Sequence, residues 1–350
     1  MEVHQNINSG GKRKFENIET LRGLIIILVV LGHVIGVDGD GGMRVSDDSI
    51  WRYLYVSILK YMQMPVFTII AGWVYALKPV TALSRSGFMK RKALRLLVPL
   101  VSVGTLYFIV QQIVPGTNVK EAFSSIWRIY IFPFSLYWYL PALFIVFAIV
   151  CWVDMKGWAS QFHQWSRFFL FSLIIFTVET FLPSSFPNLF GFKGGFFLLP
   201  FFVLGIGMRR FAHRIATPRY KMFYCIGFII CLLLTQIEWF GRIYGILPDN
   251  FLHLTRLNLV VGLFAAAFVI NLQIRNNFLI WIGGYAYSIY LFHAFGTAAG
   301  RIILTEMDFN IPLFIFLLSS VLGIFCPILL DRILNFWPLP RLVFLGKLKR

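Results

Sequence analysis

The sequence predicts an all-α protein, a polytopic membrane helix bundle of about 10 transmembrane helices with both termini in the cytoplasm. Hydrophobic residues make up 58% of the 350 residues, which is more apolar sequence than a soluble domain of this length needs. Many apolar stretches approach the roughly 20 residues that a helix needs to cross a bilayer. A transmembrane β-barrel would instead show short segments of alternating polarity.

The positive charge of the chain also indicates a membrane protein. A formal net charge of +17 would suggest nucleic-acid binding in a soluble protein. Here the Lys and Arg residues gather in alternate loops, as the positive-inside rule predicts for cytoplasmic loops. We therefore expect membrane lipids as partners and no nucleic acid. No Cys-x-x-Cys pair occurs among Cys151, Cys225, Cys231 and Cys326, so we expect neither a disulfide nor a metal site.

The chain begins with a polar segment, residues 1–14, that we expect to be a disordered cytoplasmic tail. The first helix is predicted over residues 18–37. Its apolar run follows Lys12, Arg13 and Lys14 and resembles a signal peptide. No small-residue cleavage site follows the run, so we expect this helix to stay uncleaved. The acidic loop after it, residues 37–48, is expected to face outward.

The second helix is predicted over residues 53–77 and contains Pro65, which lacks a backbone N–H and weakens the turn before it. The next loop carries the strongest basic cluster of the chain, made of Arg85, Lys90, Arg91, Lys92 and Arg95. This cluster is either a topology signal that contacts lipid headgroups or an anion site for a phosphorylated cofactor. Its spacing leaves both interpretations open.

The rest of the chain predicts eight further helices, over residues 96–114, 136–153, 167–183, 195–211, 222–241, 255–272, 278–303 and 311–334. The aromatic stretch 118–132 is expected to lie at the membrane surface on the outer side. Ten helices place both termini on one side, together with the basic loops after the second and sixth helices. We expect one transmembrane domain, residues 15–336, followed by a basic cytoplasmic tail, residues 337–350.

Arg22 and the ionisable residue His33 mark the first helix. Arg22 precedes the apolar run and His33 interrupts it, eleven residues later. Eleven steps of about 100° return to within roughly 20° of the starting direction, so both side chains share a face about 16 Å apart along the axis. A polar residue at the depth of His33 usually faces a bundle interior or a water-filled cavity. A histidine that merely bonds a neighbouring helix is the plainer alternative.

Further ionisable residues fall at mid-membrane depth or nearer the outer side, namely Glu179, Glu238, Arg256, His293 and Arg301. Several such groups imply a polar cavity, because isolated charges in lipid are costly. Tyr290, His293 and Thr297 share a helix face by their spacing. A histidine there can act as base, acid or hydrogen-bond partner. We treat Glu179, Glu238, Tyr290, His293 and Arg301 as candidates for acceptor contacts or a proton relay.

The residues alone leave two classes of function open. There is no serine nucleophile elbow, no Walker loop and no His/Cys spacing for a metal ion. Buried His and Glu residues suit a proton-coupled transporter or a flippase of a lipid-linked sugar or small anion. They suit an acyl-transfer centre equally well.

Five motifs follow one another along nearly the whole chain, namely Leu21-Arg22-Gly23 running to His33, Met64-Pro65-Val66-Phe67 with Gly72, Lys92-Ala93-Leu94-Arg95, Trp138-Tyr139-Leu140-Pro141 and the segment from Tyr285 to His293. In this order they resemble the acyltransferase-3 family of integral membrane acyltransferases. That family's signature is an Arg, ten intervening residues and a His on the first helix. Lys92 stands where the family has the first Arg of an Arg-x-x-Arg motif, and lysine keeps the charge without the planar fork.

The resemblance implies transfer of an acyl group, usually acetyl, from acyl-CoA to a hydroxyl of a carbohydrate or glycolipid acceptor such as a cell-surface polysaccharide. It implies no bound cofactor, because acyl-CoA, and in the usual case acetyl-CoA, is the donor substrate. His33 would be the general base or a transient acyl carrier, and Arg22 would act beside it. Arg91, Lys92 and Arg95 would hold the CoA phosphates. The expected location is a bacterial inner membrane.

Overall fold

The computed structural model describes residues 2–348 except 38, 40, 79, 82, 119 and 184, and of residues 2–14 it describes the backbone alone. Its described residues form helices and connecting loops, with no strand among them. The first half holds α1 Glu2–Ile35, α2 Ile50–Leu54, the π-helix η1 Tyr55–Leu59, α3 Gln63–Tyr75, α4 Arg85–Ile113, the 3-10 helix η2 Phe123–Ser125, α5 Arg128–Ile131, the 3-10 helix η3 Ser135–Trp138 and α6 Tyr139–Met155.

The second half holds α7 Phe162–Phe181, the 3-10 helix η4 Leu189–Gly191, α8 Phe192–Arg210, α9 Ala212–Ile215, α10 Pro218–Ile243, α11 Phe251–Leu254, α12 Leu257–Asn271, α13 Asn277–Glu306, α14 Pro312–Leu334 and α15 Pro338–Leu345. Within the described part of the chain, each of the ten predicted helices has a counterpart. Eight helical segments are long and apolar enough to cross a membrane. The counterparts that do not reach that mark are α7 and the shorter apolar helix α12.

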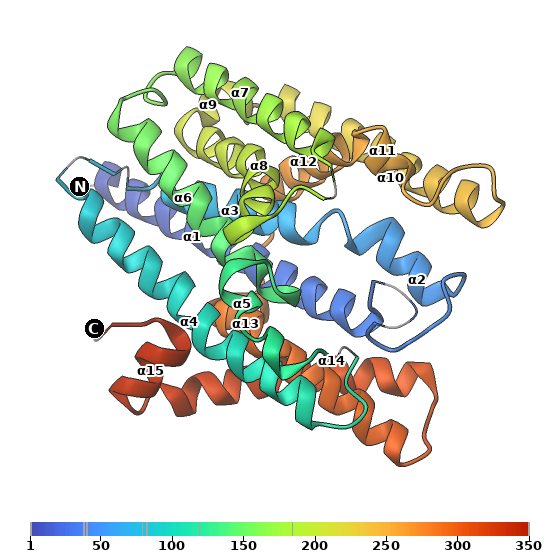
Figure 1. The fold of residues 1–350 in the computed structure, drawn as a ribbon. Coiled ribbons are helices and arrows are strands. Elements are labelled where there is room, and N and C mark those ends of the chain that lie inside the picture. The colour runs from blue at the N-terminus through green and yellow to red at the C-terminus, as the bar shows by residue number, and fades with distance from the viewer. Residues whose placement is uncertain are drawn as a thin grey trace.

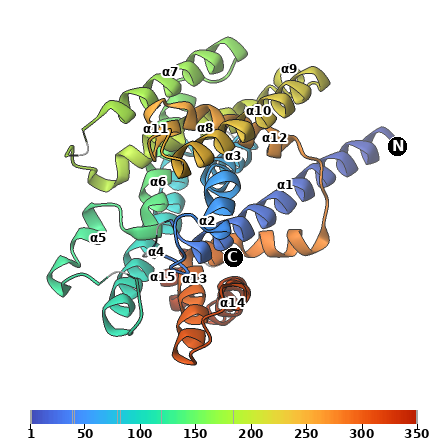
Figure 2. The ribbon, with the colours of Figure 1, turned by 90° about the vertical axis from the view of Figure 1, so that its right-hand side faces the viewer.

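The long helices lie in three groups (Figure 1). The middle group is α1, α3 and α6, with α7, α8, α10 and α12 on one side and α4, α13 and α14 on the other. The same order is visible from the side (Figure 2). Helix α1 contacts α3, α13 and α14, so it is enclosed by neighbours from both halves of the chain.

Glycine lets these helices approach closely. A Cβ atom at Gly23 of α1 would lie 2.0 Å from the carbonyl oxygen of Leu279 in α13, and one at Gly283 would lie 2.3 Å from that of Glu19. Helices α3 and α8 meet in the same way, since a Cβ at Gly72 would lie 2.0 Å from the Phe202 oxygen. Membrane helices gain much of their association from such backbone contact, because lipid offers no hydrophobic drive between helices.

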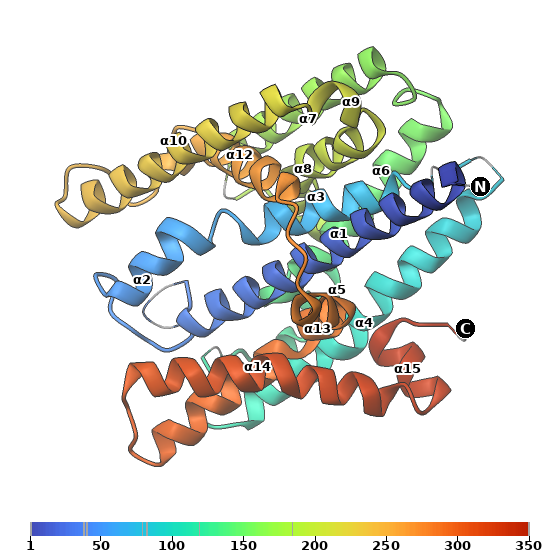
Figure 3. The ribbon, with the colours of Figure 1, turned by 180° about the vertical axis from the view of Figure 1, so that it is seen from behind.

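The beginning of α1 and the end of α15 lie at one end of the bundle, which we name the terminal end (Figure 3). The described residues of the loops 36–49 and 114–122 lie at the opposite end, named the far end (Figure 3). There Arg44 Nη2 donates to the carbonyl oxygen of Gly116 at 3.2 Å. An even number of crossings is consistent with both termini sharing an end. That the terminal end faces the cytoplasm stays a prediction.

Several boundaries differ from the sequence expectation. Helix α1 begins at Glu2, before the predicted start at residue 18, and Met1 lies outside the described residues. The tail 337–350 contains α15, although its last two residues lie outside the described part. Hydropathy marks the part of a helix that crosses lipid and says little about polar turns that extend it.

The second predicted helix is interrupted, and Pro65 accounts for this. Its π-helical and α-helical parts are separated by residues 60–62, just before the turn that Pro65 occupies. Proline cannot donate to the carbonyl of Tyr61, four residues earlier, so the helix loses a hydrogen bond there. The predicted surface helix 118–132 corresponds to η2 and α5. Phe123 of η2, Tyr130 of α5 and Trp127 just before α5 are exposed.

Candidate functional site

A cavity of about 620 Å³ lies at the far end of the bundle. Residues of α1, α4, α13 and α14 line it. The rest of the lining comes from Gly36, Val37, Gly41, Gly42, Thr117, Asn118, Glu121, Pro133, Phe134, Ser135, Leu136 and Trp138. Polar groups are spread over its wall, from Tyr107, Gln111, Gln112, Thr117, Asn118, Ser135, Thr297 and Ser319. A space of this size and polarity can admit a sugar-sized, hydroxyl-rich molecule.

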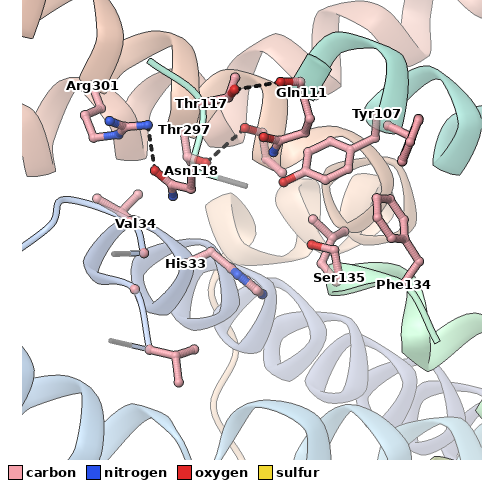
Figure 4. A pocket seen from close by; sticks show the side chains of 18 of the residues that line it. His33, Val34, Tyr107, Gln111, Thr117, Asn118, Phe134, Ser135, Thr297 and Arg301 are labelled. Atoms are coloured by element: carbon pink, nitrogen blue, oxygen red, sulfur yellow. Dashed lines mark hydrogen bonds between the residues drawn. The ribbon is translucent and has the colours of Figure 1, made fainter. Parts of the chain in front are cut away.

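His33 projects into this cavity from the last turn of α1 (Figure 4). Its side chain is exposed to the cavity although α1 itself is enclosed by other helices. The ring lies 4.8 Å from that of His293, centroid to centroid, at an interplanar angle of 54°. The structure therefore pairs the two histidines that the sequence placed on separate helices.

His293 is fully buried behind His33. Its Nδ1 lies 3.0 Å from the Ile289 oxygen and 2.9 Å from the Tyr290 oxygen. Because carbonyl oxygens only accept hydrogen bonds, Nδ1 carries the proton and the neutral ring keeps a lone pair on Nε2. That Nε2 atom has no hydrogen-bond partner among the described residues. The arrangement leaves one buried acceptor beside the exposed histidine.

Arg22 lies toward the terminal end, where it lines a much smaller pocket of about 100 Å³. Its Nη1 forms an ion pair with Glu19 at 2.9 Å. Tyr287 and Tyr290 of α13 line the same pocket. Arg22 and His33 thus both face α13, one at each space, as their shared helix face predicts.

Tyr290 stands between the small pocket and the cavity. Its hydroxyl donates to the carbonyl oxygen of Leu136 at 2.6 Å, and Leu136 lines the cavity. The Tyr290 ring also lies 5.7 Å from that of Tyr139, another wall of the small pocket. Tyr290 therefore joins the lining of the small pocket to Leu136 in the lining of the cavity.

The three cations of the predicted phosphate-binding cluster differ in their contacts. Arg95 Nη1 donates to the Leu345 oxygen at 2.7 Å, and its guanidinium lies 3.7 Å from the centre of the Tyr287 ring. Lys92 Nζ lies 4.0 Å from the centre of the Phe147 ring. Arg91 is exposed. The three cations share one stretch of α4, but two of them are engaged by the protein.

Helix α15 produces one of these contacts. It packs on α4, with Leu345 fully buried and Ser102 Oγ donating to the Val343 oxygen at 2.6 Å. After it, Lys347 forms an ion pair with Asp331 of α14 at 2.9 Å. The predicted basic tail therefore covers part of the terminal end beside Arg95.

The two predicted carboxylates lie outside the cavity lining. Glu238 is buried, where its carboxylate accepts from the Tyr61 hydroxyl at 3.0 Å and from the Leu252 N–H at 3.1 Å. Glu179 lies on α7, which does not contribute to the cavity. These contacts explain Glu238 as a structural group that joins α10 to its neighbours, and neither carboxylate is brought to the histidines.

Arg301 does reach the cavity, and with it come groups that the sequence did not single out. Arg301 Nη2 donates to the Gly116 oxygen at 2.8 Å. The same atom donates to Asn118 Oδ1 at 2.9 Å (Figure 4). Arg44 donates to the same Gly116 oxygen. Arg44 is the only basic residue between Val37 and Ser49, in the loop that is otherwise acidic. This contrast in charge could have indicated Arg44 from the sequence, whereas no sequence feature points to Gly116 or Asn118.

A comparison with protein families identifies the kind of protein. A family model described as an acyltransferase domain, of the acyltransferase-3 type, matches residues 15–332. The chain belongs to the acyltransferase-3 family. It is therefore an acyltransferase, and its apolar helices make it an integral membrane protein. The match favours the enzyme over the transporter interpretation. Comparison with curated proteins and with solved structures gives no significant match.

Proposed function

We propose that this acyltransferase moves an acyl group, most simply acetyl, from acyl-CoA to a hydroxyl of a carbohydrate or glycolipid acceptor. The observation that carries the proposal is His33, exposed in a cavity of about 620 Å³ among polar side chains. The acceptor would occupy this cavity and bring a hydroxyl to His33. A bacterial inner membrane and a cell-surface polysaccharide are the setting that we propose for it.

In this mechanism His33 is the general base. It takes the proton of the acceptor hydroxyl as the oxygen attacks the thioester carbonyl carbon, and a positioned base of this kind contributes roughly 10² to 10⁴ in rate. The new C–O bond forms while the C–S bond breaks, and the proton passes on to the CoA thiolate. His293 would keep the ring of His33 in place and accept a hydrogen bond through its free Nε2.

A second form of the mechanism uses His33 as a transient acyl carrier. The imidazole would attack the thioester first, and the acceptor hydroxyl would then take the acyl group from the ring nitrogen. Both forms end in the same products, and they differ in whether CoA leaves before the acceptor reacts.

We propose the terminal end as the donor site. Arg22, Lys92 and Arg95 lie there, and guanidinium and ammonium groups bind phosphates well. At 1.5 Å per residue, Arg22 lies about 16 Å from His33 along α1, so the CoA phosphates and the thioester would occupy separate places. The thioester arm would have to pass the Tyr290 hydroxyl and its bond to Leu136. Donor binding would then break the hydrogen bond between Tyr290 and Leu136.

The direct test is acyl transfer by the purified protein. Acetyl-CoA carrying a labelled acetyl group is incubated with the protein and an envelope polysaccharide extract, and both free CoA and labelled polysaccharide are measured. We expect both to rise together, and both to fail with the variant His33→Gln. If the protein releases no CoA and labels no acceptor under any donor chain length, the acyl-CoA proposal is wrong.

A further inference from the structure

Two arginines converge on one carbonyl oxygen beside the cavity, which Arg301 lines. Arg301 Nη2 lies 2.8 Å from the oxygen of Gly116, and Arg44 Nη2 lies 3.2 Å from the same atom. The groups come from α13 and from the loop after α1, which are far apart in the sequence. Asn118 completes the arrangement by accepting from Arg301 at 2.9 Å (Figure 4). Two like charges are thus held side by side.

Neither arginine has an acidic partner in the part of the chain that the structure describes. Among the ion pairs of those residues, none includes Arg44 or Arg301. Glu121, the acidic side chain among the described residues of the cavity lining, accepts from Ser125 Oγ at 2.9 Å. Arg301 is only 6% exposed, so water screens its charge poorly. Buried charges are usually paired, and an unpaired pair of cations costs free energy.

A guanidinium offers five N–H donors, and only one nitrogen of each of these arginines donates to the described protein groups. The remaining donors can form the paired hydrogen bonds that a carboxylate or phosphate accepts. Asn118 and the Gly116 carbonyl hold Arg301 in one position. The site therefore has the charge and the fixed geometry that anion recognition needs.

We propose that Arg301, assisted by Arg44, binds an anionic group of the acceptor, either a carboxylate or a phosphate. This inference rests on the proposed function, and it adds that the acceptor is a charged saccharide or glycolipid. Arg301 follows His293 by eight residues on α13, which is about 12 Å along the helix axis. An acceptor held at its anionic group by Arg301 would extend along the cavity and present a hydroxyl at His33.

The test compares glucose, glucuronic acid and glucose 6-phosphate with the purified full-length protein. Acetyl transfer from acetyl-CoA gives kcat/KM for each sugar, and saturation-transfer NMR measures binding even of a sugar that is not acetylated. We expect the two anionic sugars to bind better than glucose. In Arg301→Gln this preference should fall by about ten- to a hundredfold, the worth of a charge-assisted hydrogen bond. Binding of glucose should stay unchanged.

Arg242→Gln is the matched control, because Arg242 is also at the far end, bonds the Asp47 carbonyl oxygen and does not line the cavity. If Arg301→Gln does not fold, as judged by size-exclusion chromatography, the exposed partner supplies Arg44→Gln, for which a smaller loss of the same preference is expected. Equal binding of glucose and the anionic sugars, or a preference that survives Arg301→Gln, overturns the inference. Preferential anion binding that is lost in Arg301→Gln supports this inference. Failure of the proposed function shows separately, as the absence of CoA release and acceptor labelling in the polysaccharide assay.

Discussion

The two spaces along α1 differ in size and in the partners of their cations. At the terminal end, the pocket beside Arg22 holds about 100 Å³, Arg22 is paired with Glu19, and Arg95 is bonded to Leu345. At the far end, the cavity holds about 620 Å³ and Arg301 has only uncharged partners among the described residues. The far end is therefore already open to a ligand, whereas a ligand at the terminal end must displace contacts of the protein.

The contacts between α1 and α13 supply a physical reason for the difference. Near the terminal end these helices meet through backbone, at Gly23 and Gly283, where no space is left for a Cβ atom. Near the far end they meet through the rings of His33 and His293. A layer of side chains needs more room than backbone contact does. The helix pair is therefore tightest beside Arg22 and leaves room for a cavity at His33.

Replacing His33, the proposed general base at the far end, should have the largest effect on acyl transfer. His33→Gln keeps hydrogen bonding but cannot take up a proton at neutral pH. We expect acyl transfer to fall by roughly 10² to 10⁴, because a positioned base contributes that much. His33→Ala should behave alike, since a small apolar residue is tolerated in a membrane helix. Near-normal turnover of the Gln variant at normal expression would make His33 a packing residue and His293 the better candidate.

The next prediction concerns the terminal end, where we propose that acyl-CoA binds. Arg95→Ala should raise the KM for acyl-CoA by about ten- to a hundredfold, the worth of one charge-assisted contact, and leave the acceptor KM near its original value. Arg242→Ala is the control, since Arg242 is a basic residue of the far end that does not line the cavity. Arg95→Ala also frees α15, so the thermal unfolding midpoint is measured alongside. An unchanged KM for acyl-CoA would indicate that the basic cluster of α4 acts only as a topology signal.

The pair of His33 and His293 allows a finer test of the far end. His293→Gln removes the Nε2 acceptor beside His33 without removing the exposed ring. We expect kcat to fall by about two- to tenfold, in line with one hydrogen bond, and the KM for acyl-CoA to stay unchanged. A fall as large as that of His33→Gln would show that the two histidines act as one unit, and His293 would then be more than a positioning residue.

The smallest expected effect on the rate of acyl transfer comes from the glycine contact between α1 and α13 near the terminal end. Gly283→Ala places a Cβ 2.3 Å from the Glu19 carbonyl oxygen, whereas a Cβ at the neighbouring Gly284 meets nothing within 4 Å. Gly283→Ala should lower stability by roughly 1–3 kcal/mol, the usual cost of overpacking. Gly284→Ala should be neutral or slightly stabilising, because alanine favours a helix. Thermal unfolding in detergent compares the two, and equal midpoints would contradict the tight α1–α13 contact.

Much of this molecule could be predicted from local sequence. Apolar runs of sufficient length mark the membrane helices, and the helical repeat places Arg22 and His33 on one face of α1. Pro65 predicts the interruption that separates η1 from α3, because its missing N–H acts on its own helix. These features depend on neighbours within a few turns, so they can be predicted without the rest of the fold.

Which of the polar residues meet depends instead on the packing of the whole chain. Arg301 finds its partner Gly116 at a distance of 185 residues in the chain, and Arg95 finds Leu345 at 250. Nothing in helical periodicity distinguishes Glu238, which is bonded to Tyr61, from His293, which lies beside His33. The reason is that helix packing sets the rotation and depth of each helix against its neighbours, and this packing depends on contacts between segments that are distant in the sequence.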